Sequence, residues 1–294
     1  MNSKNIHSAI ILCGGMSRRM GEDKGLMKID NKPMIIHILE TIPPQFDEVV
    51  LVFNDSDKIA KYKSSLQKFL ISKHDIFKEE SANYRDKKDV FSNDKNNISS
   101  KYKIDRAEYD FGGFNISLVF AEDEIKDKGP LSGIMTGLKT IATDYALVLP
   151  CDSPYITCKF TKHIFSILNK NLVMNNNIDS ITPFYIEDLE SYKNVVNRLS
   201  DDDELKYIIS ENDGFFYKSI TNDILREIII NNSEPLHSIY KKDNHIVIER
   251  LLKSDEKQAK SLLKLINSYF IIIDDEKIEK INFKNINSKK DLLF

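Results

Sequence analysis

The chain has 294 residues and a formal net charge of −3, from 42 Lys and Arg against 45 Asp and Glu. This length suffices for a sizeable buried core, and the charge balance argues against a general nucleic-acid-binding protein, which carries a basic field. The three cysteines contain no CxxC pair, so neither a disulfide framework nor a zinc site is indicated. Because no apolar run is long enough for a signal peptide or a membrane span, we expect a cytoplasmic protein with no membrane partner.

The first predicted element is a buried strand over residues 6–12, which is apolar on both faces and stops at Gly14-Gly15. Polar and cationic residues follow at once: Ser17, Arg18, Arg19, Gly21 and Lys24. Glycine allows backbone N–H groups to face an anion, and Arg19 and Lys24 would neutralise phosphate charge. The spacing is neither that of a Walker A loop nor GxGxxG. The stretch predicts a binding surface for polyphosphate.

A regular alternation of helices and strands follows this loop. A turn at 31–33 leads into a helix that Pro43-Pro44 ends, residues 47–53 predict a second buried strand, and 56–71 have the pattern of an amphipathic helix. This order is typical of a doubly wound, Rossmann-like α/β fold with a mostly parallel sheet and helices on both faces. In such folds the ligand binds at the carboxyl ends of the strands, where the glycine loop and Asn54 both lie.

The same alternation continues in the second half of the chain. We predict strands at 116–120, 145–150 and 268–274, and helices that begin at Gly129-Pro130 or lie within 159–168, 245–252 and 257–266, whereas 181–185 is an apolar segment without an assigned element. The segment EPLHSIY (234–240) indicates a further strand or turn, and 283–293 a loop that enters a terminal helix. Together these elements predict one elaborated domain over residues 1–294.

Two polar, charged segments interrupt the alternation, at about 72–115 and about 186–232. We interpret both as insertions on the single domain, the first of them solvated, with a partner-binding element as its alternative. The end of the first, 110–114, is expected to form a hairpin or turn. Weak helical patterns lie in the second, at 203–210 and 220–230.

Asp152 is the sharpest candidate for chemistry, because it directly follows an apolar strand and precedes Pro154. A carboxylate at the edge of a sheet, opposite a phosphate loop, is the minimum for metal-assisted nucleotidyl transfer, and Mg²⁺ prefers oxygen ligands. The alternative is an aspartate that caps the following helix. The glycine and cation loop favours the metal site, with Arg19 and Lys24 stabilising a pyrophosphate leaving group.

Two further residues lie at the same predicted edge of the sheet. Asp123 follows the third strand, and its alternative is an ordinary loop acid. Asn54 offers a donor and an acceptor to the edge of a base, and its alternative is a residue of a strand-ending turn. The six histidines show no metal-ligand spacing, and only His237, in EPLHSIY, is expected near a substrate pocket.

Five segments of the chain resemble the molybdenum cofactor guanylyltransferases, a family within the sugar-nucleotide type of nucleotidyltransferases. In chain order they are LCGGMSRRMGEDKGLMKIDNKPMI, GPLSGIMTGL, ALVLPCDSPYI, EPLHSIY and FKNINSKKDL. They are distributed from one end of the chain to the other, and the two polar segments fall between them. Cys13 stands where the family more often has Ala.

The resemblance implies the nucleotide-diphospho-sugar transferase fold and the transfer of GMP from GTP to the terminal phosphate of molybdopterin-bound molybdenum, with Mg²⁺ and release of pyrophosphate. It suggests proteins of molybdopterin synthesis or insertion, or molybdoenzyme chaperones, as protein partners. Carried over by position, it implies an Mg²⁺ ligand at Asp152, an active-site role for Asn287 and nucleotide contacts at Leu12, Cys13, Gly14, Gly15, Lys24, Asn54 and Asp123.

Other interpretations stay open. The loop chemistry would be the same in a molybdopterin cytidylyltransferase, or in a nucleotidyltransferase that acts on a phosphorylated sugar or alcohol. A different class is a non-catalytic nucleotide-binding adaptor that delivers the cofactor. The presence of Lys24 and Asp152 argues against that loss of catalysis.

Overall fold

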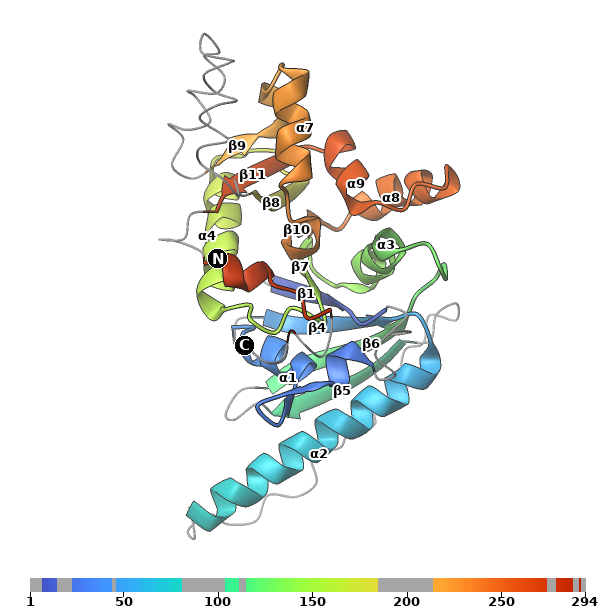
Figure 1. Ribbon diagram of the computed structural model, residues 1–294, viewed down its shortest axis with the longest axis vertical. Coiled ribbons are helices and arrows are strands. Elements are labelled where there is room, and N and C mark those ends of the chain that lie inside the picture. Colours follow the sequence, from blue (N-terminus) through green and yellow to red (C-terminus); the bar gives the residue numbers. More distant parts are fainter. Residues whose placement is uncertain are drawn as a thin grey trace.

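A nine-stranded sheet forms the centre of the computed structural model, which describes residues 7–14, 23–43, 46–80, 104–110, 115–184, 214–273, 279–287 and 291 (Figure 1). Across the sheet the strands are, in spatial order, β5 (Ile104–Asp110), β6 (Asn115–Glu122), β4 (Phe46–Phe53), β1 (His7–Leu12), β7 (Tyr145–Pro150), β10 (Ile239–Lys241), β8 (Ser180–Phe184), β11 (Ser268–Ile272) and β9 (Phe215–Phe216).

The middle of the sheet is parallel, because β6, β4, β1 and β7 pair with one another in the same direction. All six residues of β1 are buried, which explains the apolar run from Ala9 to Leu12. β8 and β11 are also parallel, whereas β5, β10 and β9 pair antiparallel to their neighbours. The predicted class, an α/β fold with a mostly parallel sheet, is confirmed, and the sheet is mixed toward both edges.

Helices cover both faces of the sheet, and the residues of β1 alternate between them. Ala9 and Ile11 pack in the core under α1 (Met34–Glu40), α2 (Ser56–Glu80) and α4 (Cys158–Val173). Ile10 and Leu12 face the opposite core, which α3 (Pro130–Thr140), α7 (Asp223–Asn231), α8 (Asn244–Lys253) and α9 (Ala259–Leu265) share. Figure 1 shows α3 and α4 on opposite sides of β1 and β7. This confirms the doubly wound arrangement.

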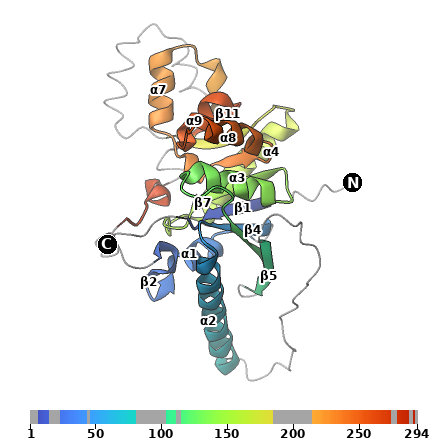
Figure 2. The same ribbon diagram turned by 90° about the vertical axis from the view of Figure 1, so that its right-hand side faces the viewer.

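Part of the first predicted insertion forms regular structure that the sequence did not predict. α2 continues to Glu80 instead of ending near residue 71, and Figure 2 shows it extending away from the sheet. Strand β5 pairs antiparallel with β6, and its Arg106 lies 3.2 Å from the buried carboxylate of Glu48. An edge strand needs few apolar residues, which is why IDRAEYD did not predict a strand.

The second predicted insertion also includes regular structure. β9 pairs with β11, and α7 buries Leu225, Ile229 and Ile230 against the sheet. The side chain of Asn222 caps α7 by accepting from the N–H groups of Ile224 and Leu225. The helical pattern at 220–230 is therefore confirmed, while the one at 203–210 lies outside the described residues.

Short elements complete the described chain. The sequence did not predict the two-stranded hairpin of β2 (Lys28–Ile29) and β3 (Lys32–Pro33), whose turn has φ 50° at Asp30 and φ 63° at Asn31. Four 3-10 turns are η1 (Lys24–Leu26), η2 (Tyr217–Ser219), η3 (Pro235–His237) and η4 (Lys280–Phe283). The predicted terminal helix falls almost entirely on residues outside the described ranges. Among the described helices, none has the length and apolar character to cross a membrane.

Candidate functional site

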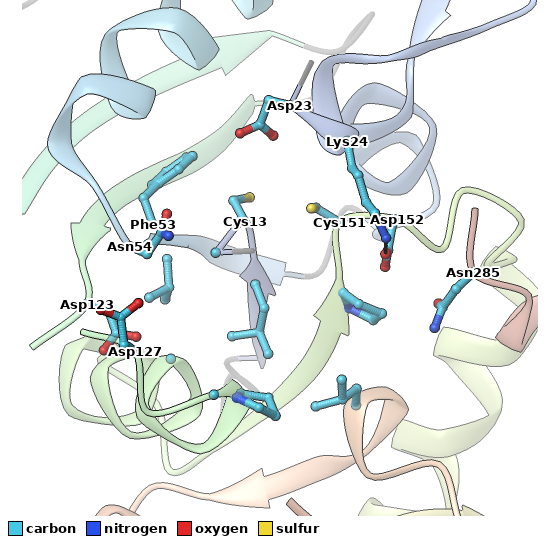
Figure 3. A pocket seen from close by; sticks show the side chains of 18 residues that line it. Cys13, Asp23, Lys24, Phe53, Asn54, Asp123, Asp127, Cys151, Asp152 and Asn285 are labelled. Carbon is cyan, nitrogen blue, oxygen red and sulfur yellow. Dashed lines mark hydrogen bonds and ion pairs between the residues drawn. The ribbon is translucent and has the colours of Figure 1, made fainter. Parts of the chain in front are cut away.

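A cavity of about 530 Å³ lies at the carboxyl ends of β1, β4 and β7. Parallel strands that end together create such a crevice, which is where ligands bind in open α/β sheets. Polar residues converge on it from both sides, as Figure 3 shows. The cavity is lined by Leu12, Cys13, Gly14, Asp23, Lys24, Val52, Phe53, Asn54, Asp123, Asp127, Gly129, Pro130, Gly133, Pro150, Cys151, Asp152, Leu236 and Asn285.

Lys24 and Asp152 form an ion pair at one side of this cavity. The Lys24 Nζ lies 2.8 Å from Asp152 Oδ2, and the two side chains are 26% and 17% exposed. Lys24 begins η1, whereas Asp152 lies two residues after the end of β7, and the pair joins residues 128 positions apart in the chain. The same ammonium donates a 2.9 Å hydrogen bond to Asn287 Oδ1. A cation and a carboxylate thus face the cavity together.

The segment after η4 packs onto the turn that carries Asp152. The N–H of Ile286 donates a 2.8 Å hydrogen bond to the carbonyl of Asp152, and the hydroxyl of Ser153 donates to Asn285 Oδ1. His237 Nε2 lies 3.1 Å from the same hydroxyl oxygen. His237 is 1% exposed and is not among the residues that line the cavity, so its side chain supports the site through Ser153.

The opposite side of the cavity carries Asn54 and Asp123, at the ends of β4 and β6. Asn54 Oδ1 is buried and has no hydrogen-bond partner among the described residues. Asp123 Oδ1 accepts hydrogen bonds from Ser132 Oγ at 2.5 Å and Thr136 Oγ1 at 3.0 Å, both on α3. Burial raises the pKa of the Asp123 carboxyl, and these two hydrogen bonds oppose the rise. Two oxygen acceptors therefore face this end of the cavity.

Cys13 and Cys151 both line the cavity and follow the neighbouring strands β1 and β7. Figure 3 shows their sulfurs turned toward each other. Both are buried free thiols, as expected for reduced cysteines, and Cys158 is partly exposed. Burial and the neighbouring Cys151 raise the pKa of the Cys13 thiol. A thiol with a raised pKa is a poor nucleophile and a poor metal ligand at neutral pH, so Cys13 has no evident catalytic role.

The structure brings most of the predicted site residues to one cavity. Those that line it are Leu12, Cys13, Gly14, Lys24, Asn54, Asp123 and Asp152, and Asn287 contacts Lys24 from the C-terminal segment. Gly15 and Arg19 lie outside the described residues.

Sequence reasoning did not single out several lining residues, among them Asp23, Asp127 and Asn285. The sequence patterns that could have identified these three residues were weak. Asn285 lies in the same FKNINS segment as Asn287, and Asp23 directly precedes Lys24.

Three comparisons with known proteins agree on the kind of protein that this chain is similar to. The family model described as "MobA-like NTP transferase domain" matches residues 9–76 and 103–264. A "Probable molybdenum cofactor guanylyltransferase" of Methanothermobacter thermautotrophicus is 24% identical, with 98% of each chain covered. A "Molybdenum cofactor guanylyltransferase" of Syntrophotalea carbinolica is 27% identical, over 56% of this chain and 52% of its own length.

Solved structures show the same fold. The molybdopterin-guanine dinucleotide biosynthesis protein A of Archaeoglobus fulgidus superposes with a TM-score of 0.54 at 17% identity, over 97% of this chain and 95% of that one. The 4-diphosphocytidyl-2C-methyl-D-erythritol synthase of Anaerococcus prevotii superposes with a TM-score of 0.53 at 12% identity, over 99% and 94% of the two chains.

Proposed function

Because the chain belongs to the MobA-like NTP transferase family and is a nucleotidyltransferase, we propose that it transfers GMP from GTP to the phosphate of the molybdenum–molybdopterin cofactor. The products would be the guanine dinucleotide form of the cofactor and pyrophosphate. A relative that matches this chain over 98% of both lengths and is named a probable molybdenum cofactor guanylyltransferase supports this acceptor and this nucleotide.

The observation that carries the proposal is the placement of Lys24 and Asp152 across one cavity from Asn54 and Asp123. A nucleoside triphosphate has a polyanionic end and a hydrogen-bonding base at the other end. The cavity offers a cation and a carboxylate on one side and two oxygen acceptors on the other. Its chemistry therefore matches a nucleoside triphosphate that lies across the ends of β1 and β4.

Lys24 would be the main residue that neutralises the charge of the phosphates. The acceptor phosphate is already anionic, so the reaction needs no strong general base, and positioning with charge neutralisation suffices. Lys24 would leave its ion pair with Asp152 Oδ2 to contact the phosphate oxygens and stabilise the leaving pyrophosphate. Asn287 accepts from the same ammonium and would keep it at this side of the cavity.

The Asp152 carboxylate fits an Mg²⁺ ion that is bound jointly by protein and nucleotide. Among the described residues, no group of three or more His, Cys, Asp or Glu side chains forms a complete metal site. Mg²⁺ commonly takes only one or two carboxylates and completes its shell with waters and substrate phosphates. Asp152 would hold such an ion, which would offset the negative charge of the phosphates.

The two acceptors at the opposite side favour guanine. The base-pairing edge of guanine carries two neighbouring N–H donor groups, whereas that of cytosine has a single amino donor beside acceptors. Asn54 Oδ1 has no hydrogen-bond partner in the part of the chain that the structure describes, and the Asp123 carboxylate is held in place by α3. Both would accept hydrogen bonds from the guanine edge, which supports GTP over CTP.

Pyrophosphate release tests the proposal directly. Purified protein is mixed with Mg²⁺, molybdenum–molybdopterin and either GTP or CTP, and pyrophosphate is followed over time. We expect release with GTP and formation of the guanine dinucleotide cofactor. Release with CTP alone would identify a cytidylyltransferase, release only with a phosphorylated sugar or alcohol would identify another acceptor, and nucleotide binding without release would identify an adaptor.

A further inference from the structure

Lys24 is held in place from outside the cavity by two residues of helix α2. Lys58 and Tyr62 lie one helical turn apart on α2, and both contact Asp23, which directly precedes Lys24. The Lys58 Nζ lies 2.9 Å from Asp23 Oδ2, and the Tyr62 hydroxyl donates a hydrogen bond to Asp23 Oδ1. Both carboxylate oxygens of Asp23 are thus used in contacts with one helix.

Gly25, which follows Lys24, packs against the same Tyr62. A Cβ atom on Gly25 would lie 2.3 Å from the Tyr62 hydroxyl and 3.1 Å from two ring carbons. This backbone approaches the ring so closely that only glycine fits there. Lys24 therefore lies between two residues that both contact Tyr62.

Tyr62 is itself fixed by the core. It is fully buried, and its ring packs edge-to-face on Phe53 with a centroid distance of 4.8 Å. Phe53 lines the cavity and precedes Asn54. Burial raises the pKa of the Tyr62 hydroxyl, which favours the protonated form that donates to Asp23.

We propose that Tyr62 is a positioning residue, which holds Asp23 and Gly25 and thereby places the Lys24 ammonium at the Asp152 side of the cavity. The hydroxyl does not reach the cavity, so it would act only through η1. The placement of Lys24 follows from the contacts alone, whereas its effect on turnover rests on the proposed function.

The first test is Tyr62→Phe, which removes the hydroxyl and keeps the ring against Phe53. Tyr145→Phe is the matched control, because Tyr145 donates a 2.9 Å hydrogen bond to the carbonyl of Ile178 and does not line the cavity. We expect Tyr62→Phe to lower kcat with GTP about tenfold, since a small displacement of a catalytic group is costly, while Tyr145→Phe leaves it unchanged. Equal loss in both variants would overturn the proposal.

The second test asks whether Tyr62 acts through Lys24. GTP affinity is measured for Tyr62→Phe, Lys24→Ala and the double variant. We expect Tyr62→Phe to weaken binding several-fold in the wild-type background and to have no further effect beside Lys24→Ala, which is the signature of residues that act as a unit. Independent, additive losses would show that Tyr62 has a purely structural role.

A third measurement does not depend on the enzyme's reaction. Amine acylation is followed at Lys24 by peptide mass spectrometry without nucleotide, with the exposed Lys253 on α8 as the internal reference. Tyr62→Phe should raise the acylation rate of Lys24 relative to Lys253 about threefold, because the ion pair between Lys24 and Asp152 loosens. If wild-type protein fails to bind GTP and this rate still rises, the proposed function is wrong and the positioning role stands. An unchanged rate would refute the positioning role.

Discussion

The ammonium of Lys24 lies 2.8 Å from the carboxylate of Asp152, so the cation and the acid proposed for phosphate and metal binding neutralise each other. Both side chains are partly exposed, so the pair is screened by water and separates at modest cost. This weak pairing is compatible with the proposed contacts of Lys24 to the phosphates and of Asp152 to the metal.

Asp152→Ala should abolish turnover with the fold intact, because the variant lacks the carboxylate proposed to bind Mg²⁺. Pyrophosphate release over a Mg²⁺ titration, with thermal unfolding of the same sample, measures both effects. Asp223→Ala is the control, since Asp223 is exposed in the first turn of α7. A wild-type rate for Asp152→Ala would exclude the metal role.

Lys24→Ala should lower kcat by about 10²- to 10³-fold, the cost of losing one preorganised contact to developing charge. Lys264→Ala is the matched control, because Lys264 forms a 2.8 Å ion pair with Glu227 on α7 and does not line the cavity. Steady-state kinetics with GTP distinguishes the two. Similar kcat values for both variants would remove Lys24 from the mechanism.

Asp123→Asn should reduce the preference for GTP over CTP, because the amide presents a donor where the carboxylate presents an acceptor. Competitive binding of the two nucleotides measures the preference. Glu124→Gln is the control, since Glu124 contacts Lys139 and does not line the cavity. An unchanged preference would indicate that Asp123 does not contact the base.

Asp123→Asn should also be more stable than wild type at neutral pH, by about 1 kcal/mol, as is common when a functional charge is removed from a buried site. Burial raises the folded-state pKa of Asp123 above its ordinary value of 3.8, so the folded state binds this proton more tightly than the unfolded state. The protonated Asp123 carboxyl therefore contributes to the stability of the wild type at low pH, and this contribution is lost as the pH rises through the folded-state pKa. Urea unfolding should therefore show a larger difference between the two proteins at pH 7 than at pH 4, and an equal difference at both would contradict this origin.

Arg106→Ala should lower the free energy of unfolding by about 1 kcal/mol, because it removes the cation from the buried Glu48. Glu48 keeps its hydrogen bonds from Ser8 Oγ and the N–H of Ala142, which limits the loss. Glu108→Ala, an exposed position on the same strand β5, is the control for a simple change in edge-strand propensity. Denaturant unfolding compares the variants, and equal stabilities would show that the ion pair contributes nothing.

The parts of the fold that were predicted from the sequence are those with local signals. β1, β4 and β7 contain apolar runs because both faces are buried, and Asp152 lies two residues beyond one of them, while Lys24 follows the glycine loop after another. β5 was missed because an edge strand tolerates polar residues, and β9 because two residues carry no periodicity. The organisation as a single domain, the protein partners and the cytoplasmic location remain predictions.

The contacts around the site could not be read from spacing. Tyr62 reaches Asp23 across 39 residues, and Asn287 reaches Lys24 across 263. No local pattern records such pairs, because they depend on how α2 and the C-terminal segment pack against the sheet. The candidate residues were thus predictable one by one, whereas their supporting contacts required the structure.

The contact between Asn287 and Lys24 also has a consequence for biosynthesis. A ribosome makes Lys24 long before Asn285 to Asn287, so a growing chain can assemble β1, β4 and β7 while the Asp152 turn still lacks Ile286. These contacts to the cavity form only when residues 285–287 have left the ribosome and docked. Catalytic competence would therefore arise only after these residues are made, and a translation product that stops before them would lack it.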